Sequence, residues 1–174
     1  MDARLAIASL RAVRRYRPDP LGAEAERRIL DAGRLTGSAS NRQPWRFAVV
    51  GPAAREAVAA ALYSPAHVLA APFVVAVTVR PLGRLYDVDA GRAAQSMMLA
   101  AWADGIGSCP NGVADPDALA AALGLADGER APLVISFGLP DPPRDPARRD
   151  PERWSAGARR LPLEDVVRVV GGAP

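Results

Sequence analysis

The chain has 174 residues, of which 49% are hydrophobic and 24% are charged, and its formal net charge is +3. This composition is that of one globular domain with its own core, and it excludes a disordered or collagen-like chain. All 22 basic residues are arginines with acidic residues interspersed among them, which is unlike the basic stripe of a nucleic-acid-binding protein, and we expect no nucleic-acid partner.

The first half of the chain alternates predicted helices and strands. Pro18 and Pro20 separate the first two helices, because proline interrupts a helix. The run from Pro72 to Val79 is nearly all apolar and rich in β-branched residues, which is typical of a central strand buried on both faces. In chain order the sequence predicts a helix over 2–14, a helix over Ala23 to Leu35, a strand over 46–50, a helix over 53–62 and a strand over 72–79.

The second half begins with a long predicted helix from Asp87 to Asp104, whose many small residues suit a buried core helix or a helix at a dimer interface. Asp115 is a predicted N-cap with Pro116 in the first helical position. That helix is expected to end at Leu123, before Gly124. A last central strand is predicted over 133–139.

The C-terminal part of the chain changes in composition. From Pro140 to Pro151 it is rich in Pro, Asp and Arg, which predicts an extended arm, and residues 161–170 are apolar again. An arm with an apolar end needs a surface to pack on, so we expect residues 140–174 to pack on a partner subunit. We find no internal repeat and assign residues 1–174 to one domain.

The most informative stretch runs from Ser38 to Trp45, with the sequence Ser-Ala-Ser-Asn-Arg-Gln-Pro-Trp. Asn and Gln amides each offer donors and an acceptor, so they can bind the edge of a flat heterocycle. Pro44 is expected to hold Gln43 in an extended backbone. The segment is therefore a candidate ligand-binding loop, and the alternative is an ordinary turn whose Ser and Asn side chains bond the backbone.

Together with Arg11-Ala12-Val13-Arg14-Arg15-Tyr16 and Gly105-Ile106-Gly107-Ser108-Cys109-Pro110-Asn111-Gly112, this block resembles the nitroreductase family of FMN-dependent oxidoreductases. The resemblance implies an α+β fold with a mixed sheet sandwiched by helices, in an intertwined homodimer with flavin at the interface. It also implies that NAD(P)H reduces FMN and that a small acceptor, such as a nitroaromatic or a quinone, reoxidises it by ping-pong hydride transfer through flavin N5. No catalytic side chain is expected, because the flavin carries the chemistry.

The resemblance also implies which residues bind FMN. The phosphate and ribityl chain would be held by the N-terminal motif, in which Ala12 and Leu10 replace usual polar residues, and by basic residues near the C-terminus. The ring edge would be bound by the polar loop, and the glycine-containing block would approach N5 and O4. The candidate cofactor-binding residues are Arg11, Ala12, Arg14, Ser38, Ser40, Asn41, Gln43, Gly107, Asn111, Gly112, Arg159 and Arg160.

Cys109 and His67 are the only cysteine and the only histidine. An intrachain disulfide and a Cys/His zinc cluster are therefore excluded, and we expect no metal. We expect Cys109 to be a buried packing residue and His67 a semi-buried residue with hydrogen-bond partners. The chain has neither a signal-peptide pattern nor an apolar run of membrane-spanning length, so we expect a cytoplasmic protein without a membrane partner.

Three alternative functions remain. One is a specialised flavin enzyme that oxidises a biosynthetic intermediate, or fragments or dehalogenates a substrate. Another is a flavin-binding protein without turnover, which the departures at Leu10 and Ala12 favour. The third is an arginine-rich protein that binds nucleic acids.

Overall fold

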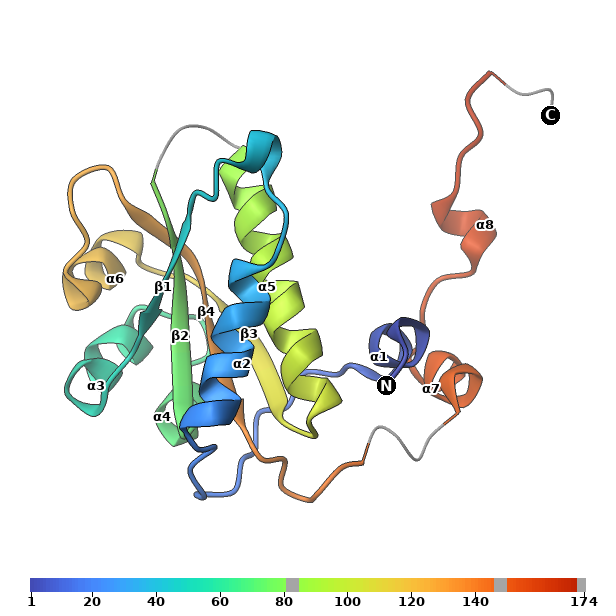
Figure 1. Cartoon of the computed structure of the whole chain (residues 1–174), viewed down its shortest axis with the longest axis horizontal. Coiled ribbons are helices and arrows are strands. Elements are labelled where there is room, and N and C mark those ends of the chain that lie inside the picture. The colour runs from blue at the N-terminus through green and yellow to red at the C-terminus, as the bar shows by residue number, and fades with distance from the viewer. Residues whose placement is uncertain (81–84, 146–149, 172–174) are drawn as a thin grey trace.

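A four-stranded antiparallel sheet lies between two layers of helices (Figure 1). The computed structural model describes residues 1–80, 85–145 and 150–171. The strands have the order β1-β2-β4-β3, which makes β1 and β3 the edge strands. Their bounds are Trp45–Val49 for β1, Phe73–Val79 for β2, Gly107–Gly112 for β3 and Arg130–Gly138 for β4.

The central strand β2 joins the two halves of the core, because all seven of its residues are buried. Successive side chains of a strand point to opposite faces of the sheet. Val75 and Val77 accordingly belong to the cluster under the helices α2 (Ala23–Arg34) and α5 (Leu85–Ala103). Val74 and Ala76 belong to the cluster on the other face.

The face opposite α2 and α5 is covered by three shorter helices, α3, α4 and α6. Their bounds are Pro52–Ala60, Ala66–Ala70 and Pro116–Leu123. The start of α6 confirms the predicted cap, since the backbone N–H of Ala118 donates to Asp115 Oδ1 at 3.0 Å. Its end also confirms the prediction, because Gly124 has φ +62°, a conformation that favours glycine.

The predicted helices and strands between residues 23 and 139 are all present, with ends that differ by a few residues. Three elements there were not predicted, one of which is a short 3-10 helix over Ala39–Asn41 within the polar loop. The other two are the short helix α4, which lies just before β2, and the edge strand β3 over Gly107–Gly112, where no strand was predicted.

Two other predictions were wrong. The first helix, α1, spans only Ala3–Ser9 instead of 2–14, because the chain after Leu10 turns extended and runs beside β3, where the N–H of Val13 donates to the carbonyl of Ser108. The expected mixed sheet is antiparallel at every pairing of the four described strands. The isolated bridge between Ala12 and Ser108 is parallel.

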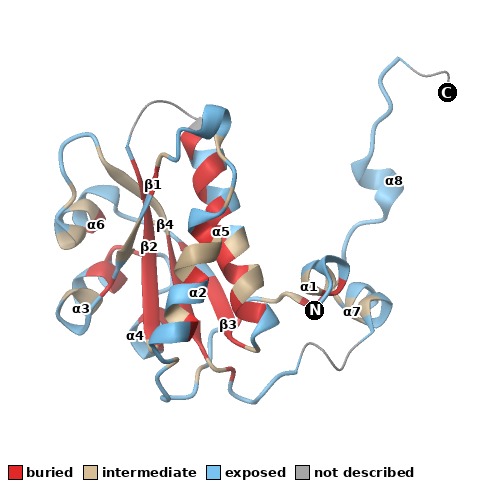
Figure 2. Ribbon diagram, in the orientation of Figure 1, coloured by how far each residue is buried: buried red, intermediate tan, exposed pale blue. Residues whose placement is uncertain are grey.

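The C-terminal segment leaves the body along α1 (Figure 1). It contains α7 (Pro151–Gly157), which packs beside α1, and α8 (Leu163–Val166). Figure 2 shows that α8 and the residues after it are exposed along their whole described length. Val169 and Val170 are 77% and 86% exposed, an unusual state for apolar side chains.

Candidate functional site

The polar loop between α2 and β1 is anchored at its start and exposed at its tip. The N–H of Ala39 donates to Asp89 Oδ2 of α5 at 3.1 Å, and the N–H of Gln43 donates to Ser38 Oγ at 2.8 Å. Asn41 and Gln43 are exposed, and the Gln43 amide donates to Asn41 Oδ1 at 3.2 Å. The loop therefore presents two linked amides to solvent from a fixed base.

The backbone of this loop is strained. Ser40, Asn41 and Gln43 have φ values of +50°, +54° and +49°. Residues other than glycine rarely adopt positive φ, and three within four positions cost of order 1–3 kcal/mol each. The expectation of an extended Gln43 before Pro44 was therefore wrong. Strain of this kind is concentrated at ligand-binding sites, which favours the ligand-binding interpretation over an ordinary turn.

The N-terminal basic segment lies at the other end of α5. Its neighbour Ser9 accepts a hydrogen bond from Trp102 Nε1 at 2.8 Å, and both residues are fully buried. The polar loop, by contrast, is bound to Asp89. At a rise of 1.5 Å per residue, α5 spans about 20 Å between Asp89 and Trp102. A single chain therefore does not bring together the two groups of candidate flavin-binding residues, as Figure 1 also shows.

Arg11 holds α7 against α1. Its guanidinium donates to the carbonyls of Ala8 at 2.7 Å, Leu10 at 2.8 Å and Trp154 at 2.7 Å. It also lies 5.2 Å from the centroid of the Trp154 ring, within the range of a cation–π interaction. Arg11 is thus a structural clamp between two helices, whereas Arg14 is exposed.

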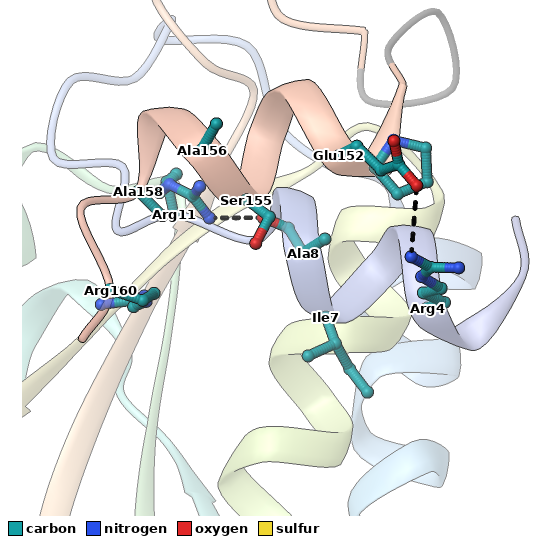
Figure 3. A pocket seen from close by; sticks show the side chains of 10 residues that line it. Arg4, Ile7, Ala8, Arg11, Glu152, Ser155, Ala156, Ala158 and Arg160 are labelled. Atoms are coloured by element: carbon teal, nitrogen blue, oxygen red, sulfur yellow. Dashed lines mark hydrogen bonds and ion pairs between the residues drawn. The ribbon is translucent and has the colours of Figure 1, made fainter. Parts of the chain in front are cut away.

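A cavity of about 720 Å³ opens between α1 and α7. Three arginines line it against one carboxylate, and Arg4 pairs with Glu152 at 3.7 Å. Figure 3 shows this pair at one end of the cavity, with Arg11 and Arg160 toward the other. Burial, and then the charge of Arg160, lower the pKa of Arg11. The cavity is therefore electropositive and suited to an anion.

Two candidate glycines pack against side chains of the same chain. A Cβ on Gly107 would lie 2.7 Å from Cβ of Val13, and one on Gly112 would lie 3.2 Å from the Tyr63 ring. Gly107 therefore needs to be glycine, whereas at Gly112 the exposed Tyr63 ring can move aside. Gly112 is exposed at the end of β3, whereas Gly107 is buried under the N-terminal segment.

Asn111 belongs to a buried polar network on the face of α4. Its amide nitrogen donates to the carbonyl of Ser64 at 2.6 Å and lies 3.3 Å from His67 Nε2. His67 Nδ1 lies 2.8 Å from Ser136 Oγ, which lies 2.8 Å from the Tyr16 hydroxyl. The prediction that His67 has hydrogen-bond partners is thereby confirmed. The side chain is more deeply buried than expected, since only 4% of it is exposed.

Burial is the main cause of the pKa shifts in this network. It lowers the pKa of His67, with a smaller contribution from the charge of Arg14. Burial raises the pKa of Tyr16 and of Cys109. All three groups are therefore neutral at pH 7. Cys109 is buried and free, which confirms its expected role as a packing residue.

Sequence reasoning missed the partners in these clusters. Ser136 is a lone polar residue in the apolar run of β4, and Trp154 is the one aromatic in a Pro-, Asp- and Arg-rich segment. A residue that differs from its neighbours in this way is a sequence signal for a specific side-chain contact, and both residues could have been singled out on that ground. Arg159 has φ +50° just after α7 and precedes Arg160. In the described residues we find no cluster of three metal-ligating side chains and no helix that could span a membrane.

The chain matches the model of the nitroreductase family over residues 7–85 and 68–139. It is 30% identical over 206 aligned positions to a Thermus thermophilus protein named NADH dehydrogenase, with 96% of this chain and 95% of that protein covered.

Solved structures share the fold at lower sequence identity. Nitroreductase A from Vibrio parahaemolyticus superposes with a TM-score of 0.83 at 22% identity, over all of this chain and 78% of the other. The NADPH:FMN oxidoreductase from Vibrio harveyi, solved with NAD+, superposes with a TM-score of 0.79 at 22% identity, over 97% of this chain and 77% of the other. A nitroreductase family protein from Clostridium difficile superposes with a TM-score of 0.79 at 23% identity, over 97% of this chain and 98% of the other. The chain therefore belongs to the nitroreductase family of oxidoreductases.

Proposed function

We propose that the protein is an FMN-dependent enzyme that uses NAD(P)H to reduce a small acceptor such as a nitroaromatic or a quinone. The observation that carries this proposal is the strained loop from Ser38 to Gln43, which presents linked amides to solvent in a chain of this family. The Vibrio harveyi protein of similar fold, an NADPH:FMN oxidoreductase solved with NAD+, supports the choice of cofactor and reductant.

The residues present fit FMN chemically. An electropositive cavity lined by Arg4, Arg11 and Arg160 suits a phosphate dianion, and the exposed amides suit the ring edge. Since Arg11 donates to three backbone carbonyls, Arg160, with Arg159 beside it, is the better candidate for direct phosphate contact. Ala12 has no hydroxyl to donate, so the N-terminal motif offers less than the family pattern.

The chain's own residues would bind and orient, and no side chain is assigned a proton transfer. Bound FMN would supply hydride transfer at N5 between NAD(P)H and the acceptor. Ser38, Ser40, Asn41 and Gln43 would bind the ring edge or the ribityl hydroxyls. The exposed end of β3, with Asn111 and Gly112, would bring backbone close to the ring.

The complete site would be formed by a homodimer. In one chain the loop contacts Asp89 and the N-terminal segment contacts Trp102, which lie about 20 Å apart along α5. A second copy is therefore needed to bring a loop and a cavity together. The exposed valines after α8 support the same arrangement, because they need an apolar surface. The edge strand β1 offers unpaired backbone groups on which such a segment of the partner could add.

An absorbance spectrum of the purified protein from 300 to 550 nm tests the proposal. It would be recorded before and after dialysis against FMN, and again after anaerobic addition of NADH or NADPH. Flavin peaks that bleach with a nicotinamide support the proposal, and a protein that stays colourless with FMN refutes it. Bound flavin that does not bleach would favour a flavin-binding protein without turnover or a different reductant, and acceptor screening would separate a general reductase from a specialised flavin enzyme.

A further inference from the structure

The buried pair of Asn111 and His67 has a defined donor and acceptor pattern. The Asn111 group that lies 2.6 Å from the carbonyl of Ser64 must be the amide nitrogen, because a carbonyl only accepts. The same nitrogen lies 3.3 Å from His67 Nε2, so its second hydrogen points to the ring. Nε2 is therefore the unprotonated nitrogen of a neutral imidazole.

The other side of the imidazole is fixed as well. In this tautomer Nδ1 carries the hydrogen and donates to Ser136 Oγ at 2.8 Å. Ser136 Oγ in turn lies 3.3 Å from the carbonyl of Cys109, to which it donates. His67 thus connects the middle of β4 with the end of β3, and every one of its ring nitrogens has a partner.

The location of Asn111 gives this pair a consequence at the surface. Asn111 is 5% exposed, but its neighbours Pro110 and Gly112 are exposed at the edge of the sheet. Both amide hydrogens of Asn111 are used inside the protein, by the carbonyl of Ser64 and by His67 Nε2. A buried hydrogen-bonded side chain of this kind fixes the conformation of the backbone that carries it.

We infer that His67 is a positioning residue, which through Asn111 holds the Pro110–Gly112 end of β3 in the conformation that binds the flavin. The inference rests on the proposed function for its ligand, and it depends on the neutral imidazole accepting a hydrogen bond at Nε2. His67 itself is buried behind Asn111 and makes no contact with the ligand in this scheme.

Two substitutions at His67 distinguish the role of Nε2 from the role of Nδ1. His67→Gln places an amide oxygen near the position of Nε2 and can still accept from Asn111. His67→Asn is one methylene shorter and can replace only Nδ1, toward Ser136. Each removes an imidazole from the same buried site, so a role in packing alone predicts similar behaviour for the two variants.

Two measurements on both variants and the parent protein test the inference. The first is the NMR signal of the Asn111 side-chain amide without flavin, assigned with Asn111→Asp. The second is the FMN dissociation constant from fluorescence titration. We expect His67→Asn to shift the amide signal and to weaken FMN binding about tenfold, because a buried amide hydrogen loses its acceptor. We expect His67→Gln to shift the amide signal less than His67→Asn does, and to keep an FMN dissociation constant within about threefold of that of the parent.

Equal amide signals in the two variants, or equal losses of FMN affinity, would overturn the inference. If the parent protein binds no FMN, the proposed function fails instead. In that case the amide signals still decide whether His67 positions Asn111, so the two failures are distinguishable.

Discussion

The hydrogen bond between Ser9 and Trp102 should contribute measurably to the stability of this protein. Trp102 Nε1 donates to Ser9 Oγ at 2.8 Å, and Ser9 Oγ donates to the carbonyl of Leu5 at 2.6 Å. Both Ser9 and Trp102 are 0% exposed, so no water can replace either partner. Ser9→Ala would leave the indole N–H buried without an acceptor.

We expect Ser9→Ala to lower the free energy of unfolding by about 1–3 kcal/mol, the cost of an unsatisfied buried donor. For a chain of this size a loss of about 2 kcal/mol lowers Tm by about 4–8 °C. The measurement is urea unfolding at fixed protein concentration, with thermal unfolding as a second probe. The higher helix propensity of alanine offsets part of the loss.

A double-mutant cycle isolates the bond itself. In a Trp102→Phe background the indole N–H is absent, so adding Ser9→Ala should cost at least about 1 kcal/mol less than it does in the parent. The helix-propensity gain is the same in both backgrounds and cancels. If Ser9→Ala costs the same in both, the indole is not coupled to Ser9 and the reasoning fails.

Three further predictions concern packing, pH and assembly. Gly107→Ala should destabilise by about 1–3 kcal/mol in urea, because the new Cβ would lie 2.7 Å from Val13, whereas Gly157→Ala, with no atom within 4 Å of its new Cβ, should be nearly neutral; equal effects would contradict this. Burial lowers the pKa of His67, so the unfolded chain takes up a proton first as pH falls. The contribution of His67 to the free energy of unfolding should therefore be fully present above about pH 6.5 and be lost as the pH falls below that value. The urea midpoints at pH 5 and pH 7 should differ less in His67→Gln than in the parent protein, and an equal difference in the two proteins would exclude His67 as a cause. Deletion from Leu161 onward should convert a dimer into a monomer in sedimentation velocity, and an intact dimer after deletion would show that the exposed tail is not needed for assembly.

Local sequence patterns determined the central elements of this fold. The apolar, β-branched run from Phe73 to Val79 forms a fully buried strand, because only a central strand can bury both of its faces. Asp115, Pro116 and Gly124 set the ends of α6 through contacts within a few residues. The family, too, was identifiable from sequence, since its motifs lie in short continuous segments.

Tertiary structure alone decided how these segments are used. A helix was predicted to continue past Leu10, but the hydrogen bond from Val13 to Ser108 of β3 holds the chain extended there. The resemblance implies that Arg11 binds phosphate, and only the fold shows that its guanidinium also donates to the carbonyl of Trp154, which is 143 positions away. The hydrogen-bond partners of His67, which lies on α4, are Asn111 on β3 and Ser136 on β4. Sequence determined what depends on neighbours along the chain, whereas donor and acceptor roles depend on residues that only folding brings together.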